Sequence, residues 1–190
     1  MRQQAPSAPD IAQPDTGWDV RRLDWSQFEK LVALLFDAEG FVVECYGNAN
    51  PDDGITLVAK KGEVTFGVQC KHWKSARVGI KEARAFVLAL HDRRLQHGFL
   101  VTLDGYTHAA LAYARRNQIE LMDEPMLRRN LEEVQWRLNP AFAELMNDNR
   151  KICPKCESEM VLRTATKGAH AGQQYWGCST YPRCTFRMPV

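Results

Sequence analysis

Hydrophobic residues recur every three or four positions after residue 24, which is the spacing of one helix face. The stripe consists of Trp25, Phe28, Leu31, Val32, Leu35 and Phe36. Ser26 and Glu29 have the S-x-x-E spacing of a capping box, and Gly40 follows the stripe. We therefore expect a helix that starts near Trp25, is capped by Ser26 and ends at Gly40.

Beyond this helix the pattern changes between the two-residue period of strands and the longer period of helices. Strands are predicted at 41–47, 54–60, 64–73, 98–102 and 119–123, and the second and third form a hairpin across a tight turn. Helices are predicted at about 79–96 and 107–117, with a final helix or helix pair at 124–147 that Pro140 interrupts. This order predicts an α/β fold in which a mixed sheet is flanked by helices.

The two ends of the chain differ from its middle. Residues 1–17 contain three prolines and no periodicity, so we expect a disordered tail. An Asn-rich stretch just before Cys153 indicates a domain boundary. We therefore divide the rest of the chain into a main domain at 18–138, a linker at 139–150 and a small C-terminal domain at 151–190.

The cysteines bear on the cellular compartment. The N-terminal segment lacks the apolar core of a signal peptide, and no apolar run approaches the length of about 18 residues that a membrane span needs. We expect a cytoplasmic protein without membrane contact. In a reducing compartment its six cysteines favour metal binding over disulfides.

Four of the cysteines have the spacing of a zinc site. Cys153 and Cys156 form a C-P-K-C pair, and Cys178 and Cys184 form a C-x5-C pair. Two such loops can direct four thiolates at one tetrahedral zinc ion. So short a segment cannot fold on its few aliphatic residues, whereas zinc binding supplies about 10–16 kcal/mol. We expect structural zinc, because four thiolates leave no open position for catalysis.

The same segment resembles the C4 zinc ribbons at the C-termini of type IA DNA topoisomerases. The resemblance covers residues 153–190 and runs through "CPKC", "MVLRTA", a basic turn and "YWGCSTYPRC". It implies a DNA-binding accessory domain. Residues 150–190 also hold seven Lys and Arg against two Glu, although the whole chain carries a net charge of only +2. Such a local excess favours an anionic partner.

Aromatic and basic residues alternate along this ribbon in a way that suits DNA. Tyr175, Trp176, Tyr181 and Phe186 could stack on bases, while Arg163, Lys167, Arg183 and Arg187 meet phosphates. Trp176 and Phe186 have a second interpretation, as part of the small core of the ribbon itself.

In the main domain, the stretch "PDDGITLVAKKGEVTFGVQCKHWK" places Gln69 and Lys71 on one face of the predicted second hairpin strand. Asp52 and Asp53 precede its partner strand. Carboxylates that hold a divalent cation beside a lysine suit the hydrolysis of phosphodiesters, because the cation and the lysine neutralise charge on the phosphorane. By itself, however, this pattern is a weak signal.

Residues 24–128 resemble the Mrr-like restriction endonuclease domain, a branch of the PD-(D/E)xK nuclease superfamily. The resemblance runs from "WSQFEKLVALLFDAEGFVVECYG" through the hairpin to "HGFLVTLDGYTHAALAYARRNQIELMDEPML". It implies a restriction-endonuclease-like fold, with Gln69-x-Lys71 in place of the (D/E)-x-K of the superfamily. Glu29 matches a glutamate of the first helix that often faces the site, but Glu29 could equally serve as the capping partner of Ser26.

One position departs from the family pattern. The family reads D-G-G-I-D, in which the last Asp is the main metal ligand, whereas this chain reads Asp52-Asp53-Gly54-Ile55-Thr56. Neutral Thr56 therefore stands where the metal-binding Asp is expected, and it is a poor magnesium ligand. Asp53 could replace that carboxylate from the loop if a bulge or turn at Gly54 redirects it.

Two hypotheses follow. The first is a Mg²⁺-dependent endodeoxyribonuclease that uses Asp53 (or Asp52), Gln69, Lys71 and Glu29, with a structural zinc ribbon as its DNA tether. The second, favoured by Thr56, is a catalytically degenerate protein that binds DNA as an adaptor or sensor. Both have double- or single-stranded DNA as partner. Nucleases of this kind often act as dimers because two strands need two sites, so a homodimer is a further expectation.

Overall fold

The computed structural model describes residues 19–45, 54–71, 76–148, 150–153, 155–156, 158–168 and 170–190. The predicted N-terminal tail lies outside the described residues, as do Asp52 and Asp53. None of the helices in the described part of the chain is long and apolar enough to cross a membrane.

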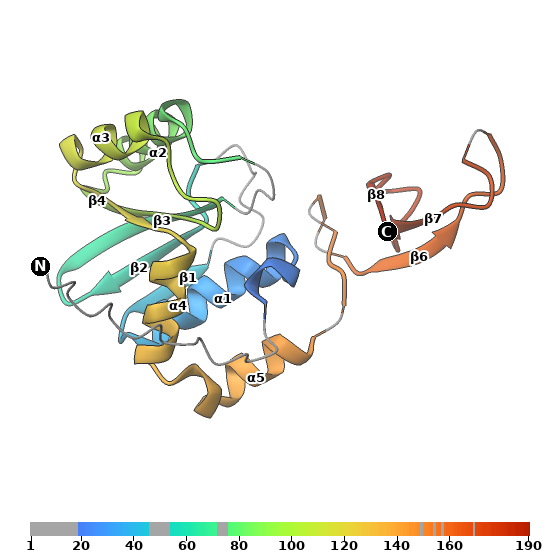
Figure 1. Ribbon diagram of the computed structural model, residues 1–190, viewed down its shortest axis with the longest axis horizontal. Coiled ribbons are helices and arrows are strands. Elements are labelled where there is room, and N and C mark those ends of the chain that lie inside the picture. Colours follow the sequence, from blue (N-terminus) through green and yellow to red (C-terminus); the bar gives the residue numbers. More distant parts are fainter. Residues whose placement is uncertain are drawn as a thin grey trace, which may run out of the picture.

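The main domain is built on a five-stranded sheet with the strand order β1-β2-β3-β4-β5 (Figure 1). The strands are β1 (Val42–Cys45), β2 (Leu57–Lys61), β3 (Val64–Lys71), β4 (His97–Thr102) and β5 (Ile119–Met122). The first three strands pair antiparallel and the last three pair parallel. The predicted mixed sheet is confirmed.

Helices cover both faces of this sheet and bury a separate hydrophobic cluster on each. The helices are α1 (Trp25–Ala38), α2 (Ile80–Asp92), α3 (His108–Arg116), α4 (Glu124–Glu133) and α5 (Pro140–Asn147), with 3₁₀ helices η1 (Val20–Arg22) and η2 (Trp136–Leu138). One cluster joins α1, α4 and α5 to the sheet, and the other joins α2 and α3 to its opposite face. Burial of both clusters is the main stabilising contribution to this domain.

The start of α1 corrects one prediction. The helix begins at Trp25 as expected, but its cap is Asp24 rather than Ser26. Asp24 accepts a hydrogen bond from the Gln27 N–H, and the Gln27 side chain accepts one from the Asp24 N–H, each at 2.9 Å. The stretch D-W-S-Q-F-E contains two overlapping box patterns, and the acidic residue that precedes the helix forms the box.

The domain boundaries at 138 and 150 stay predictions. Within the segment predicted as a linker, residues 140–147 form α5, with Asn139 as its cap and Pro140 at its first position. Phe142 of this helix is fully buried in the cluster on the α1 side. The helix forms because Pro is well accepted in a first turn, where its missing N–H would have no partner.

The C-terminal segment forms a separate three-stranded antiparallel sheet, β6-β7-β8, which projects from the side of the main domain where α1 begins (Figure 1). Its strands are β6 (Met160–Thr164), β7 (Gln174–Cys178) and β8 (Arg187–Pro189). Its buried cluster consists of Met160 with Cys153, Cys178 and Cys184. We call this sheet with its cysteine loops the ribbon.

Candidate active site and metal centre

Gln69 and Lys71 lie at the carboxyl end of β3, on the face of the sheet that α2 covers. Val68 and Cys70, which alternate with Gln69 and Lys71 along β3, belong to the cluster on the α1 side. By contrast, a Cβ at Gly67 would lie 2.5 Å from a side chain of α2. Because side chains alternate along a strand, Gln69 and Lys71 share the α2 face, as their spacing predicts.

The neighbouring strand brings Thr102 to the same place. Thr102 is paired in register with Lys71 at the end of β4 and is fully buried. Gln69, two positions before Lys71 on β3, is 5% exposed. Among the residues that the structure describes, neither Gln69 Oε1 nor Thr102 Oγ1, both buried, has a hydrogen-bond partner. Such atoms cost about 1–3 kcal/mol each when left unpaired, so this edge holds two oxygens to which the described part of the chain offers no partner.

Thr56 sits at an irregularity just before β2. Ile55 and Val58 both belong to the α2-side cluster, although only two residues separate them, so the alternation of side chains breaks here. The Thr56 N–H donates to the Val68 carbonyl at 2.7 Å, and the Thr56 hydroxyl accepts the Cys70 N–H at 3.1 Å. The side chain at the expected ligand position is therefore bound to the backbone of β3.

Gly54 provides the turn that leads into this irregularity. Its φ of +70° lies in the left-handed region, and a Cβ there would lie 2.7 Å from the Ala89 Cβ on α2. Any other residue would strain the backbone and clash with α2. Because the chain between Gly54 and Leu57 is not a regular strand, alternation cannot be used to assign a face to Asp53.

Glu29 lies in the second turn of α1 and is half-buried. Its interpretation as the capping partner of Ser26 is wrong, because Gln27 fills that role for Asp24. Its placement toward the site, like the roles of Asp52 and Asp53, stays a prediction.

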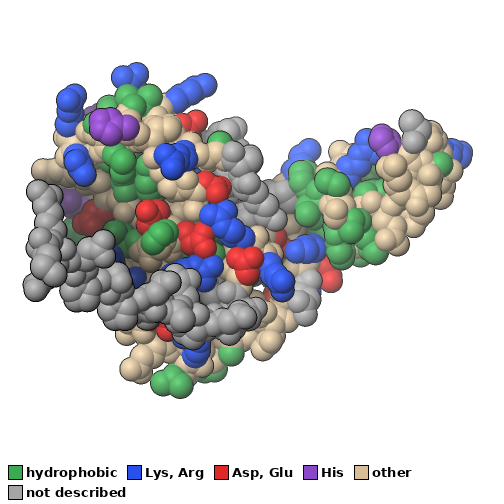
Figure 2. All heavy atoms as spheres, viewed as in Figure 1, with side chains coloured by type: hydrophobic (Ala, Val, Ile, Leu, Met, Phe, Trp, Pro, Cys, Tyr) green, Lys and Arg blue, Asp and Glu red, His purple; other side chains and the backbone are tan. Residues whose placement is uncertain are grey.

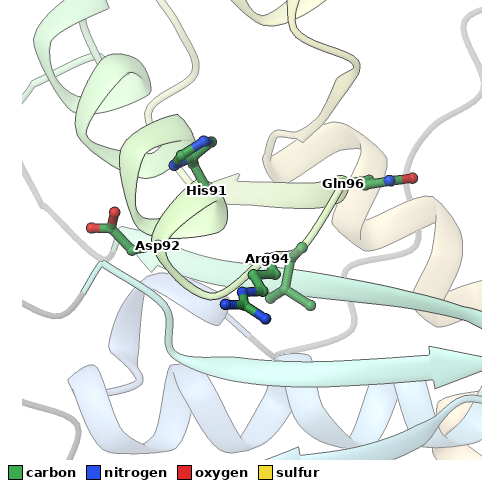
Figure 3. A pocket seen from close by; sticks show the side chains of 5 residues that line it. His91, Asp92, Arg94 and Gln96 are labelled. Atoms are coloured by element: carbon green, nitrogen blue, oxygen red, sulfur yellow. The ribbon is translucent and has the colours of Figure 1, made fainter.

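A surface hollow lies at the opposite end of the sheet and does not belong to this site. It is lined by His91, Asp92, Arg94, Leu95 and Gln96. The next residue, His97, pairs with Phe66, five positions before Lys71 on β3. In Figure 3 the labelled side chains point in different directions rather than toward a common centre. All four are exposed, so this hollow does not have the convergent polar groups of a ligand site.

The four ribbon cysteines converge on one point. Their sulfur atoms all lie within 4.8 Å of one another, with Cys153 Sγ 3.7 Å from Cys184 Sγ and Cys156 Sγ 3.3 Å from Cys178 Sγ. A tetrahedral ion with Zn–S bonds of about 2.3 Å places its sulfurs about 3.8 Å apart, so the arrangement fits zinc. Burial raises the pKa of the Cys153 thiol to about 12, whereas hydrogen bonding from Ser158 lowers the pKa of exposed Cys156 to about 6.

The predicted DNA-binding residues of the ribbon fall on two faces. Trp176 and Phe186 pack with Met188 against the buried cysteines, which is the core interpretation of these two aromatics. On the other face, Arg163 of β6 pairs with Tyr175 of β7, and Gly177 of β7 pairs with Arg187 of β8. Lys167, Tyr181 and Arg183 are exposed.

Arg163 is held flat on this second face. A Cβ at Gly177 would lie 3.0 Å from Arg163 Cδ and 3.3 Å from Tyr175 Cε2, so a larger residue there would crowd the arginine side chain where it crosses the sheet. The Arg163 guanidinium also lies 5.9 Å from the centre of the Tyr181 ring. We call Arg163, Tyr175, Tyr181 and Arg187 the outer ribbon face. Planar cationic and aromatic groups side by side are typical of surfaces that stack nucleobases and bind phosphates.

Comparisons with known proteins agree with this geometry. Residues 20–131, more than half of the chain, match the family described as "Restriction endonuclease". The chain belongs to this restriction endonuclease family. Residues 150–190 match the family described as "Topoisomerase DNA binding C4 zinc finger", which together with the cysteine cluster indicates zinc at the ribbon.

Sequence relatives match only part of this chain, and the chain covers only a small part of their length. It is 32% identical over 85 residues to DNA topoisomerase 1 of Archaeoglobus fulgidus, which covers 42% of this chain and 12% of that protein. It is 33% identical over 45 residues to DNA topoisomerase 1 of Methanocaldococcus jannaschii, covering 24% and 5%. The solved DNA modification-dependent restriction endonuclease AspBHI is similar in fold, with a TM-score of 0.50, 15% identity, and coverage of 67% of this chain and 37% of that one.

The oxygens that the site edge offers, as the structure describes it, are neutral, whereas magnesium usually binds carboxylates. At the site edge, Gln69, Thr56 and Thr102 offer neutral oxygens, and the Thr56 hydroxyl already accepts a hydrogen bond. Mg²⁺ is usually bound through one or two carboxylates. A complete magnesium site there would need a carboxylate from Asp52, Asp53 or Glu29.

Proposed function

We propose that the chain is a DNA endonuclease that hydrolyses phosphodiester bonds with a divalent cation. The observation that carries this proposal is the shared face of Gln69, Lys71 and Thr102 in a restriction-endonuclease domain. Two buried oxygens on this face have no partner among the described residues. Strained or unsatisfied polar groups are tolerated where function needs them. Lys71 is half-buried at the end of its strand, where its ammonium can meet a phosphate.

In this proposal each residue of the site has its own role. Lys71 neutralises charge that develops on the phosphorane, and Gln69 orients the attacking water or a cation through Oε1. Asp53, with Asp52, supplies the carboxylates for Mg²⁺. Glu29 lies on α1, which covers the face of the sheet opposite to α2, so it can add an acidic group only by reaching past the end of β3. When bound, such a cation polarises the phosphate and lowers the pKa of water.

The test is metal-dependent cleavage of supercoiled plasmid and of single-stranded DNA. Purified protein with Mg²⁺ or Mn²⁺ is expected to nick or cut DNA, and EDTA is expected to abolish the activity. Asp53→Ala is expected to abolish it as well. Cleavage that persists in EDTA, or that Asp53→Ala leaves unchanged, would overturn the proposed role of the loop carboxylates.

A second function is favoured by Thr56, whose hydroxyl is engaged with Cys70 instead of facing a ligand. In this case the domain binds DNA without cutting it and acts as an adaptor or sensor. An inactive wild type that gains metal-dependent cleavage as Thr56→Asp would select this function over the first.

DNA binding by the ribbon is part of both functions and is supported by the match of residues 150–190 to a DNA-binding zinc-finger family. We place it on the outer ribbon face, where Arg163 and Arg187 can meet phosphates and Tyr175 and Tyr181 can stack on bases. The affinity is expected to fall with salt, with a log–log slope of about −0.9 per neutralised duplex phosphate or −0.7 for a single strand. An affinity that salt does not change would contradict both functions. A homodimer stays a prediction.

A further inference from the structure

The capping box of α1 also holds the backbone that enters the ribbon. Asp24 uses Oδ1 to cap its own helix, and its second oxygen, Oδ2, accepts the Ile152 N–H at 3.4 Å. Gln27 accepts the Asp24 N–H through Oε1, and its Nε2 donates to the Asp148 carbonyl. Gln27 is only 6% exposed. The Gln27 amide and the Asp24 carboxylate thus each use one polar atom to cap α1 and the other to contact the segment that leads to the ribbon.

The same segment is fixed to the cysteine loop on its other side. Ile152 forms a β-bridge with Glu159, and the Met160 N–H donates to the Lys151 carbonyl at 2.7 Å. Cys153, the first cysteine of the cluster, follows Ile152 directly and donates its N–H to the Ser158 carbonyl. The residue that contacts α1 is therefore already part of the ribbon.

The preceding residues are anchored as well. Phe142 and Leu145 of α5 are buried in the cluster that α1 shares, and Arg150 binds the Asp148 carboxylate with two hydrogen bonds of 2.8 and 2.7 Å. That contact lowers the pKa of Asp148 to about 2, so the carboxylate stays charged at neutral pH. The described residues between α5 and the ribbon thus make contacts at several positions, with α1 through residues 148 and 152 and with one another through Arg150.

We propose that Asp24 and Gln27 hold the ribbon against the restriction-endonuclease domain, so that both bind one DNA molecule as a single surface with a fixed spacing. This inference rests on the proposed DNA binding. It replaces a loose tether by a docked domain, which loses less conformational freedom when the two surfaces bind DNA together. Figure 1 shows the ribbon beside the beginning of α1, and Figure 2 shows basic side chains on both parts.

Two substitutions separate docking from helix capping. Gln27→Glu keeps the oxygen that caps Asp24 but replaces the amide donor to Asp148 by a carboxylate oxygen. Asp24→Asn keeps one oxygen for the cap but replaces the acceptor of the Ile152 N–H by an NH₂ group. Asp37→Asn, at an exposed position near the end of the same helix, is the matched control. Thermal unfolding followed by circular dichroism shows that each variant is folded.

The first readout is hydrogen exchange at the Ile152 amide of the full, zinc-loaded chain, which needs no DNA. Exchange is expected to be slow in the wild type and in Asp37→Asn, and about tenfold faster or more in the two docking variants, because exchange follows local opening. Free exchange at Ile152 in the wild type would overturn docking, whatever the protein does to DNA.

The second readout is affinity for a long duplex and for a short oligonucleotide that only one domain can cover. The docking variants are expected to lose about tenfold or more on the long duplex, since linked sites gain through effective concentration, and to bind the short one like the wild type. Equal affinity of variants and wild type for the long duplex would overturn the single surface. A wild type that binds neither DNA contradicts the proposed function, while the exchange result still decides docking.

Discussion

The five-stranded sheet of the restriction-endonuclease domain has a hydrophobic cluster on each face, whereas the ribbon buries little more than Met160 and three cysteines. The first can be stabilised by apolar burial alone. The second has too little apolar surface for that and depends on its metal ligands. The two parts of one chain therefore resist different perturbations, and each can be broken while the other stays folded.

Loss of the metal site is the largest expected effect. Cys178→Ser removes one of four thiolates, and binding worth about 10–16 kcal/mol should be largely lost. We expect the ribbon to unfold, as measured by NMR of its backbone amides, while the restriction-endonuclease domain keeps its unfolding midpoint. A ribbon that stays folded in this variant would contradict the comparison, and an exposed Ser179→Ala change next to it is the control.

Loss of core packing is expected to act on the other domain. Phe36 is fully buried and packs edge-on against Phe41 and Phe99 at ring-centre distances of 5.0 Å. Phe36→Ala should destabilise the domain by about 3–5 kcal/mol in denaturant unfolding. Cobalt absorption at the cysteine site of the ribbon should not change. A matching loss of the cobalt signal would show that the two parts unfold as one unit.

Thr56 gives a smaller effect that separates structure from catalysis. Thr56→Val removes the acceptor of the Cys70 N–H and should cost about 1–3 kcal/mol, whereas Thr56→Ser keeps the hydroxyl and should cost less. Chemical denaturation of both variants checks this order. If valine is as stable as threonine, the hydrogen bond to β3 is not the reason for threonine at this position.

Thr102 gives the smallest expected change in stability. Thr102→Val replaces a buried hydroxyl that has no partner in the described part of the chain by a methyl group of similar size, so the free energy of unfolding should stay the same or rise by about 1 kcal/mol. DNA cleavage should nevertheless fall. A large loss of stability would instead mean that the hydroxyl is an integral part of the core.

Much of this architecture could be predicted because it depends on neighbours in the sequence. The stripe from Trp25 to Phe36 is α1, and the alternating runs around residues 57 and 68 are β2 and β3. The four cysteines converge as their spacing predicts. Local period and loop length determine these features, and both are visible in one sequence.

What escaped prediction depends on three-dimensional context. The sequence contains two overlapping boxes at the start of α1, and the structure selects Asp24, directly before the first helical residue, instead of the predicted Ser26. The hydrogen bond from Cys70 to Thr56 joins residues 14 positions apart across an irregular strand. The contacts of Asp24 and Gln27 with residues 148 and 152 span more than 120 positions, and no periodicity encodes them.

The proposed endonuclease activity is tested most directly by measuring cutting and binding of the same duplex by wild type, Lys71→Ala and Lys60→Ala. Lys60 is an exposed lysine near the far end of the neighbouring strand β2 and serves as the control. We predict that Lys71→Ala binds DNA nearly as well as the wild type but cuts it on the order of 10²-fold more slowly or less, because it removes charge stabilisation in the transition state. Lys60→Ala should cut normally. A Lys71→Ala variant that cuts DNA at the rate of the wild type would contradict this account.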